Sequence, residues 1–194
     1  MIDKETVTVA VITFNSSKYV IETLESIKAQ TYPNIILYIS DDCSTDNTVK
    51  LCKDWIEENG SRFVKTKIIV PEHNTGVAGN INRAWDACET RYIKEIAGDD
   101  KLMPNCIKDN MQYMREHPEA VFVFSKIKVF GNSDQQNKIF ESVFDYSKFN
   151  WSPEKQLDYF LRGKNFVTAS TCFANIEKIR KGEVDENPYE DLPR

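Results

Sequence analysis

The amino-acid sequence predicts an α/β protein in which a mostly parallel β-sheet is flanked by helices. Apolar runs rich in β-branched residues alternate with segments of helical periodicity through the first half of the chain, and this alternation is typical of βαβ units. Short polar clusters follow the apolar runs, as expected where strands end. The chain has 194 residues, of which 41% are hydrophobic and 28% charged, so it is long enough to bury a sizeable core.

The first strand is predicted at Val7–Phe14, a nearly continuous apolar run of the kind that is buried on both faces. The capping residues of Asn15–Ser17 then begin a helix with one apolar stripe at Val20, Leu24 and Ile27. This segment therefore predicts a strand followed directly by an amphipathic helix.

A second buried strand is predicted at Ile35–Ile39, and it closes on the polar residues Ser40–Asp42. Ser44 or Asp46 can cap the following helix, which stops at Asn59–Gly60 because glycine favours the end of a helix. The third helix of this half carries apolar residues at a 3.6-residue period, at Val77, Ile81, Ala84, Trp85 and Cys88.

Two further strands complete the first half, at Val64–Val70 and Tyr92–Ile96. The second half is less regular, and we expect these elements there: a strand at Val121–Phe130, a loop at Gly131–Lys138, a helix from Ser152 with Leu157, Phe160 and Leu161 on one face, a strand at Phe166–Ala174 and a short helix at Ile176–Lys181. The acidic stretch Val184–Arg194 adds no closing element, which predicts a truncated chain.

Charge and cysteine usage exclude several classes of protein. The formal net charge is −5 without a block of basic residues, so nucleic acid is not an expected partner. The five cysteines are odd in number and form no C-x-x-C pair, which is typical of a reducing compartment. His73 and His117 are far apart and have no cysteine at ligand spacing, which argues against structural zinc. No signal peptide or apolar stretch of the ~20 residues needed by a membrane helix is visible, which predicts a soluble, cytoplasmic protein without a membrane segment.

Four polar clusters fall at or after the ends of predicted strands: Thr13–Asn15, Asp41–Asp42, Asn74–Gly76 and Asp99–Asp100. In parallel sheets, ligands bind beyond the carboxyl ends of the strands. We therefore expect the four clusters to converge on one site.

Asp99 and Asp100 are the candidate metal ligands. Two carboxylates after a buried strand can hold Mg²⁺ or Mn²⁺, with water and substrate phosphates completing the shell. A diphosphate ligand would fit such an ion. The alternative is an ordinary turn or helix cap before Met103–Pro104.

The other clusters allow a nucleotide. Asp41 or Asp42 can accept a hydrogen bond from a nucleobase imide or a ribose hydroxyl, and since both precede the helix cap, one of them should be free for ligand. The backbone N–H groups of Asn74–Gly76 can face an anion, with a helix cap as the alternative. Phe14 could stack on a base, although its residue type alone favours buried packing.

Glu190 and Asp191 form a second pair of carboxylates near the end of the chain. One of them could act as a general base that takes a proton from an attacking hydroxyl. The alternative is a solvated acidic tail.

Together these motifs resemble the family 2 glycosyltransferases. The matching segments occur in the family's order: Val9–Asn15 with Tyr19–Val20, Leu24–Ile27 and Gln30–Pro33; Tyr38–Asp46; Asn74–Gly76 through Asn80; Tyr92–Asp100 with Met103–Pro104; and Glu190–Asp191. The chain departs from many members at Ala97, where an aspartate is common. Each segment alone is a weak motif, but the ordered set is specific.

The resemblance implies a GT-A fold and transfer of a sugar, with inversion, from a nucleotide-diphosphate sugar, with a UDP-sugar favoured and the acceptor unknown. It implies that Phe14 stacks on or flanks the base and that Asp42, or in its place Asp41, accepts a hydrogen bond from it. It makes Asp100 the ligand of Mn²⁺ or Mg²⁺, with Asp99 beside it near the ribose or donor sugar. It also assigns Asp191 as catalytic base with Glu190 alongside, and the remaining donor-site residues as Thr13, Asn15, Asn74 and Gly76.

On this reading, residues 1–118 form the donor-binding half and residues 119–194 the acceptor-side half, truncated at its C-terminus. A longer protein could be peripheral at the inner membrane face. Two other functions stay open: a nucleotide-sugar or glycan binding module without turnover, and a nucleotidyltransferase. Asn15–Lys18 is a poor version of the Gly-rich basic loop that a nucleotidyltransferase would normally need.

Overall fold

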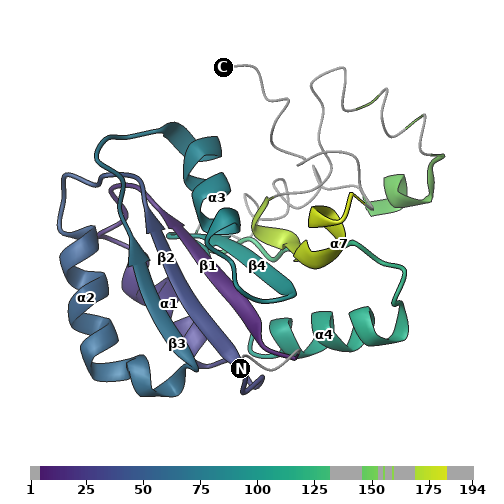
Figure 1. Cartoon of the computed structure of the whole chain (residues 1–194), viewed down its shortest axis with the longest axis horizontal. Helices are drawn as coiled ribbons and strands as arrows, with labels where there is room; N and C mark the ends of the chain where they lie inside the picture. The colour runs from purple at the N-terminus through teal and green to yellow at the C-terminus, as the bar shows by residue number, and fades with distance from the viewer. Residues whose placement is uncertain (1–4, 132–145, 153–154, 156–158, 160–168, 183–194) are drawn as a thin grey trace.

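The computed structural model describes residues 5–131, 146–152, 155, 159 and 169–182. Its described strands form one sheet in the order β3-β2-β1-β4-β6-β5. Figure 1 labels the first four of these side by side. Their bounds are β1 Val7–Thr13, β2 Ile35–Asp41, β3 Lys65–Ile69, β4 Tyr92–Ala97, β5 Phe122–Phe124 and β6 Cys172–Asn175. β1, β2, β3 and β4 are parallel, whereas β6 is antiparallel to both β4 and β5. The predicted α/β class and mostly parallel sheet are confirmed.

The register of the sheet brings the polar residues to one edge. β1 is central and pairs with β2 on one side and β4 on the other. Thr13 lies opposite Asp41 of β2, and Ile12 lies opposite Ala97 of β4. The carboxyl ends of these three strands are therefore aligned, so the loops that follow them begin side by side.

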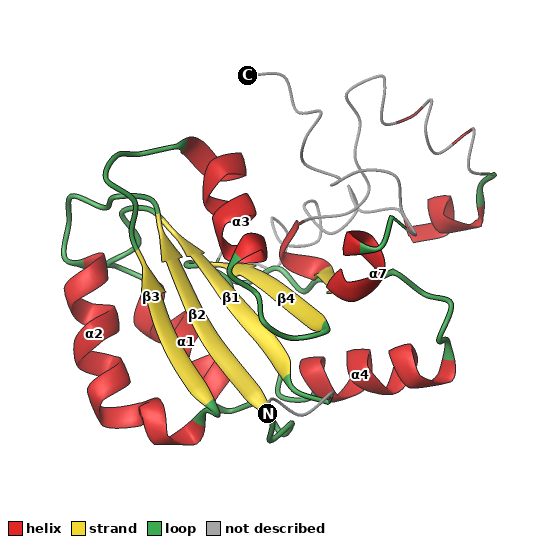
Figure 2. Ribbon diagram, viewed as in Figure 1, coloured by secondary structure: helices red, strands yellow, loops and turns green. Residues whose placement is uncertain are grey.

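Helices cover both faces of the sheet (Figure 2). The helices α1 (Val20–Lys28), α2 (Thr48–Asn59) and α4 (Cys106–Glu116) share one apolar core with alternate residues of the strands. The helices α3 (Gly76–Asp86) and α7 (Ile176–Arg180) pack on the opposite face in a second core. Short 3-10 helices lie at Gly60–Arg62 (η1), Tyr146–Asn150 (η2) and Ala169–Thr171 (η3). Successive side chains of a strand point to opposite faces of the sheet, so the buried residues of β4 and β6 enter the two cores alternately.

Some boundaries differ from the sequence prediction. The strand expected at Val121–Phe130 is shortened to β5, because β6 offers only four residues for pairing and is preceded by the turn of η3. In the described part of Phe166–Ala174, the 3-10 turn at Ala169–Thr171 comes first, and the strand begins only at Cys172. Val77, predicted on the buried stripe of α3, is 73% exposed because it lies in the first turn, beyond the end of the sheet.

The expected boundary between residues 118 and 119 falls between α4 and β5, and the strands that follow it extend the same sheet. The division into donor and acceptor halves stays a prediction. The loop at Gly131–Lys138 and the helix from Ser152 lie almost wholly outside the described residues. Among the helices that the structure describes, none has the length and apolar character needed to cross a membrane.

Candidate functional site

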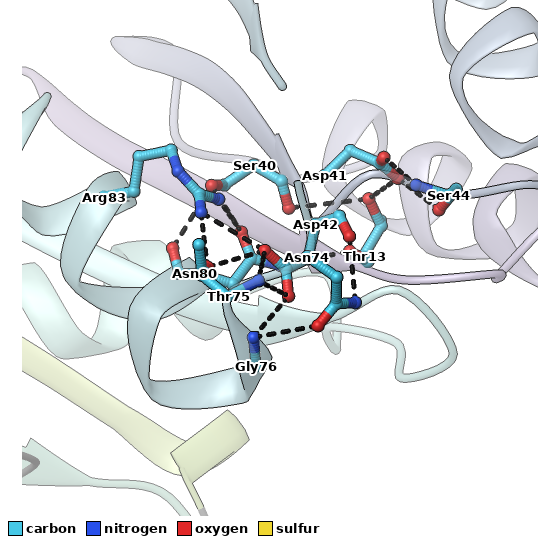
Figure 3. A network of polar contacts seen from close by, with 10 residues as sticks. All are labelled: Thr13, Ser40, Asp41, Asp42, Ser44, Asn74, Thr75, Gly76, Asn80 and Arg83. Atoms are coloured by element: carbon cyan, nitrogen blue, oxygen red, sulfur yellow. Dashed lines mark hydrogen bonds and ion pairs between the residues drawn. The ribbon is translucent and has the colours of Figure 1, made fainter. Parts of the chain in front are cut away.

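Asp41 connects the end of β2 to the end of β1. Its fully buried carboxylate accepts hydrogen bonds from the Thr13 hydroxyl at 2.8 Å, the Ser44 backbone N–H at 2.8 Å and the Ser44 hydroxyl at 2.6 Å. Figure 3 shows these side chains meeting at one end of the sheet. Asp41 thus fixes the loop after β2 against the last residue of β1.

Asp42 connects the same loop to the N-terminus of α3. Its carboxylate accepts hydrogen bonds from the backbone N–H groups of Thr75 at 3.0 Å and Gly76 at 2.7 Å, and from the Thr75 hydroxyl at 2.7 Å. The Arg83 guanidinium lies 3.2 Å from the same carboxylate. The expectation that one of Asp41 and Asp42 would be free for a ligand is not met in this structure, because protein donors contact both.

The pairing of Asp42 with α3 follows from the helix N-terminus, where backbone N–H groups lack partners within the helix and favour negative charge. Gly76 has a φ of +78°, a left-handed conformation that glycine adopts without strain. The Asn74 amide donates to the Asp42 carbonyl, and its oxygen accepts the Gly76 N–H. The backbone N–H groups of Thr75 and Gly76 are therefore occupied by Asp42 and Asn74 in this structure, while the Thr75 side chain makes no capping bond.

Hydrogen bonding also sets the charge state of Asp42. Burial by itself raises the pKa of a carboxyl, but the donors from Thr75, Arg83 and Gly76 outweigh it and hold the pKa of Asp42 below its usual range. The side chain is 3% exposed. Asp42 is thus an enclosed carboxylate that stays ionised at neutral pH.

Gly98 brings the loop after β4 close to β1. Its N–H donates to the Ile12 carbonyl at 2.9 Å. A Cβ at this position would lie 2.8 Å from Thr13 Cγ2 and 2.9 Å from Ser16 Oγ, so only glycine fits without a shift. This close contact places Asp99 and Asp100 next to the end of β1.

Asp100 is held from two directions. Its backbone carbonyl accepts a hydrogen bond from the Thr23 hydroxyl of α1 at 2.7 Å, and its carboxylate accepts one from the Ser170 hydroxyl. Asp99 is exposed, and in the described part of the chain no hydrogen bond reaches its side chain. Within the same residues, none joins Asp99 or Asp100 to Asp41 or Asp42. Of the four clusters predicted to converge, Thr13–Asn15, Asp41–Asp42 and Asn74–Gly76 are joined by hydrogen bonds. The fourth, Asp99–Asp100, lies beside this network.

A cavity of about 910 Å³ opens at Asp99 and Asp100. Its wall comes from the end of β4, the first turns of α4, the chain after β5 and the turn of η3, and its lining includes Tyr19, Lys94, Cys106 and Phe130. This volume lies within the range of small-molecule sites.

Phe14 follows β1 and is 51% exposed. The buried packing that its residue type favours is therefore wrong. Thr13 is buried at the end of the strand, while the Asn15 amide oxygen accepts hydrogen bonds from Thr45 at 2.9 and 3.3 Å. An aromatic ring thus stands at the surface beside the network of Asp41 and Asp42.

Residues 8–181 match the sequence model of Glycosyl transferase family 2. The chain belongs to this family. The match includes the bonded network and the Asp99–Asp100 loop, and it ends before Glu190 and Asp191, which also lie outside the described residues.

Curated relatives of this family 2 glycosyltransferase are longer proteins. Glycosyltransferase GlyG of Streptococcus pneumoniae is 29% identical over 119 residues, which cover 61% of this chain and 38% of GlyG. The poly(ribitol-phosphate) β-N-acetylglucosaminyltransferase TarS of Staphylococcus aureus is 27% identical over 145 residues, 73% of this chain and 24% of TarS. The chain thus spans well under half the length of these relatives.

Solved structures share the fold. A TarS fragment from S. aureus superposes with a TM-score of 0.67 at 22% identity, covering 95% of this chain and 51% of that fragment, and the fragment was also solved with UDP and with UDP-GlcNAc. A mannosyltransferase from Pyrobaculum calidifontis, in complex with GDP-Man and Mn²⁺, has a TM-score of 0.71 at 17% identity and covers 95% of this chain and 48% of its own. The predicted GT-A fold and the predicted family are confirmed.

The donor atoms after β4 fit a hard divalent cation. Asp99 and Asp100 offer carboxylate oxygens, and the described residues contain no cluster of three or more His, Cys, Asp or Glu side chains. Ala97 adds no further carboxylate. The protein side of such a site would be small, and Mg²⁺ or Mn²⁺ in such sites keeps several ligands from water and substrate.

Sequence reasoning missed several residues of this family 2 site. Arg83 and Ser40 were not singled out, yet Arg83 contacts the Asp42 carboxylate and the Ser40 hydroxyl donates to Asn80 at 2.6 Å. Lys94 and Ser170 were also missed. Lys94 had a visible signal, since a lysine interrupts the apolar run Tyr92–Ile96 of a buried strand.

Proposed function

We propose that this protein transfers a sugar, with inversion, from a nucleotide-diphosphate sugar to an acceptor hydroxyl, assisted by Mn²⁺ or Mg²⁺. One observation carries the proposal: the enclosed network of Asp41 and Asp42, beside the exposed ring of Phe14, adjoins the Asp99–Asp100 loop at the mouth of a cavity of about 910 Å³. A polar base site, an aromatic surface and a pair of carboxylates are the parts that a nucleotide-diphosphate sugar needs.

The nucleobase is assigned to the network at the end of β2. Phe14 supplies a face on which the ring can stack. Asp42, or in its place Asp41, accepts the imide N–H of the base. Because both carboxylates already have protein donors, a base that reaches Asp42 must replace one. Thr75 and Gly76 are exposed and Arg83 has 19% of its side chain exposed, so the donors of α3 are the ones that a base can reach from solvent.

The metal is assigned to the loop after β4, with Asp100 as direct ligand. When bound, the cation neutralises negative charge on the departing nucleoside diphosphate. The carboxylate of Asp100 is oriented by the Ser170 hydroxyl, and its backbone by Thr23. Asp99 is exposed and is left for the ribose or the donor sugar.

On the resemblance alone, Asp191 is assigned as the general base that takes the proton of the acceptor hydroxyl, with Glu190 alongside. A carboxylate base on the face of the sugar opposite the leaving group allows a single displacement, which inverts the anomeric carbon. We favour a UDP-sugar, because the TarS structures hold UDP and UDP-GlcNAc, and take GDP-sugars as the alternative from the mannosyltransferase.

Calorimetric titration with UDP and then GDP, each with and without Mn²⁺, tests this proposal. We expect Mn²⁺-dependent binding of one nucleotide and loss of that dependence in Asp100→Asn. The control Asp86→Asn, which removes an exposed carboxylate at the C-terminal end of α3, should bind as the unaltered protein does. A folded protein that binds neither nucleotide would contradict the donor site. Binding by a longer protein that releases no nucleotide from any sugar donor would instead favour a binding module.

A further inference from the structure

A lysine lies in the core beneath the Asp99–Asp100 loop. Lys94, in the middle of β4, is fully buried, on the same face of the strand as the buried side chains of Tyr92 and Ile96. Burial lowers the pKa of Lys94, because water no longer solvates the ammonium. A buried amine is retained only where other groups satisfy its hydrogen bonds.

The partners of Lys94 are backbone carbonyls. Its Nζ donates to the carbonyl of Ser170 at 2.6 Å and to that of Cys172 at 3.0 Å. The carbonyl between them, of Thr171, accepts the backbone N–H of Ser125 at 3.1 Å. Three successive carbonyls of the turn from η3 into β6 are therefore fixed, two of them by Lys94.

Fixing this turn also fixes the direction of one side chain. With its carbonyl bound to Lys94, Ser170 points its hydroxyl at the Asp100 carboxylate. In the described part of the chain Lys94 has no ion pair with a carboxylate, and its hydrogen bonds reach Asp100 only through Ser170. The negative charge of Asp100 also acts on the ammonium through space, without a direct contact. The three groups all line the cavity at Asp99 and Asp100.

We propose that Lys94 is a positioning residue that orients the Asp100 carboxylate through Ser170. The inference rests on the proposed function only for the task given to Asp100. Without the ammonium, the buried carbonyl of Cys172 and the partly buried carbonyl of Ser170 lose their donor, and the turn rearranges to recover hydrogen bonds. Ser170 then leaves its place, and Asp100 loses the contact that selects its orientation. Groups that orient a metal ligand in this way set the affinity of the ion as the ligands do.

Two variants and their combination test the connection. Lys94→Met removes the ammonium and keeps a long apolar chain, Ser170→Ala removes only the hydroxyl, and the double variant removes both. Tyr92→Leu is the matched control: Tyr92 lies on the same strand and face and stacks on Phe173 of β6, with ring centroids 5.8 Å apart, but has no contact with Ser170. The readouts are the melting temperature and the Mn²⁺ concentration that half-saturates binding of the nucleotide.

We expect Lys94→Met and Ser170→Ala each to weaken Mn²⁺ affinity about tenfold. The double variant should bind Mn²⁺ no more weakly than Lys94→Met alone, because the two substitutions break the same connection between Lys94 and Asp100. Tyr92→Leu should lower the melting temperature with less than a twofold change in Mn²⁺ affinity. Ser170→Thr, which keeps a hydroxyl, should restore most of the affinity. Equal affinities of Lys94→Met and Tyr92→Leu, or multiplied effects in the double variant, would overturn the inference.

Crystal structures of Lys94→Met, or of Lys94→Gln if the methionine variant does not fold, decide the matter independently of nucleotide binding. We expect the Asp100 carboxylate to leave the Ser170 hydroxyl in the Lys94 variant and to keep it in Tyr92→Leu. An unchanged Asp100 would overturn the inference. If the unaltered protein binds no nucleotide with Mn²⁺, the proposed function is overturned, and these structures still test the role of Lys94.

Discussion

Arg83 of α3 and Asp42 after β2 form an ion pair of 3.2 Å in which the carboxylate side chain is 3% exposed and the arginine 19%. The same guanidinium donates to the Thr75 hydroxyl at 2.6 Å and to the Asn80 amide oxygen at 3.0 Å. Removing one partner of an enclosed pair costs more stability than breaking a surface pair does, because the other charge is left without solvent.

Replacing Arg83 should therefore destabilise the protein measurably. We expect Arg83→Met to lower the free energy of unfolding by about 2 kcal/mol, since hydrogen bonds to a charged group are lost. Arg115→Met, which breaks the exposed ion pair with Glu5, should lower it by less than about 1 kcal/mol. Urea unfolding of both variants at neutral pH measures the difference. Equal losses would show that the Asp42 pair acts as an ordinary surface contact.

Acid should unfold the protein partly through Asp46. Burial raises the pKa of this carboxyl, but hydrogen bonds from Thr48 and Ser17 outweigh that effect and lower its pKa to about 2. An unfolded aspartate has a pKa of about 3.9. Because the folded pKa is depressed, the stabilisation is complete above about pH 3.9 and disappears as the pH falls through about 2.

Asp46→Asn tests this dependence. The variant should be less stable than the parent protein at pH 6, and the gap between their free energies of unfolding should shrink as the pH is lowered toward 2. Urea unfolding at intervals of pH measures the gap. Parallel curves over this range would mean that Asp46 titrates alike in the folded and unfolded chains.

Gly98 should not tolerate a side chain. Its missing Cβ would lie 2.8 Å from Thr13 Cγ2, and Thr13 cannot move freely because its hydroxyl is bound to Asp41. We expect Gly98→Ala to lower the free energy of unfolding by about 1–3 kcal/mol, the usual effect of overpacking. Gly60→Ala is the control, since a Cβ there meets its first neighbour at 3.5 Å; it should be neutral or slightly stabilising. Thermal unfolding of the two variants compares them.

Phe14 should contribute to nucleotide affinity without contributing much to stability. The ring is 51% exposed, so Phe14→Ala should leave the melting temperature nearly unchanged. We expect it to weaken nucleotide binding by about tenfold, because stacking on an aromatic ring is worth about 1–3 kcal/mol per base. Tyr113→Ala, which removes a ring of 45% exposure from α4, should leave binding unaltered. Calorimetry with the nucleotide checks both, and equal affinities of the two variants would remove Phe14 from the site.

The fold was readable from the sequence where local patterns and tertiary packing agree. The strands β1 and β2 are continuous apolar runs because helices cover both faces, and their bounds match the prediction to within a residue or two. Prediction was poorer after residue 120, where β5 is limited by the length of β6. The length of β5 depends on its partner β6, which is distant in sequence, so the pattern of residues around β5 does not show where the strand ends.

The site was predictable as a location more than as a set of contacts. Parallel strands end at one edge, so the polar clusters after β1, β2 and β4 could be expected there. Their partners could not, because Ser170 comes from a distant part of the chain and Arg83 lies on α3 among residues of ordinary helical composition. The expectation that Asp41 or Asp42 would be free for a ligand failed in part for the same reason, since Thr13 and Gly76 donate to them from other elements.

The strand order β4-β6-β5 has a consequence for synthesis on the ribosome. β1 to β4 can pair as they emerge, but Lys94 reaches its carbonyl partners only when the polypeptide has been translated through Cys172. Until then the amine must remain hydrated, because enclosing it without partners is costly. We therefore expect the interior beside Asp100 to close last during synthesis, after the residues that form the network of Asp41 and Asp42 have all been translated.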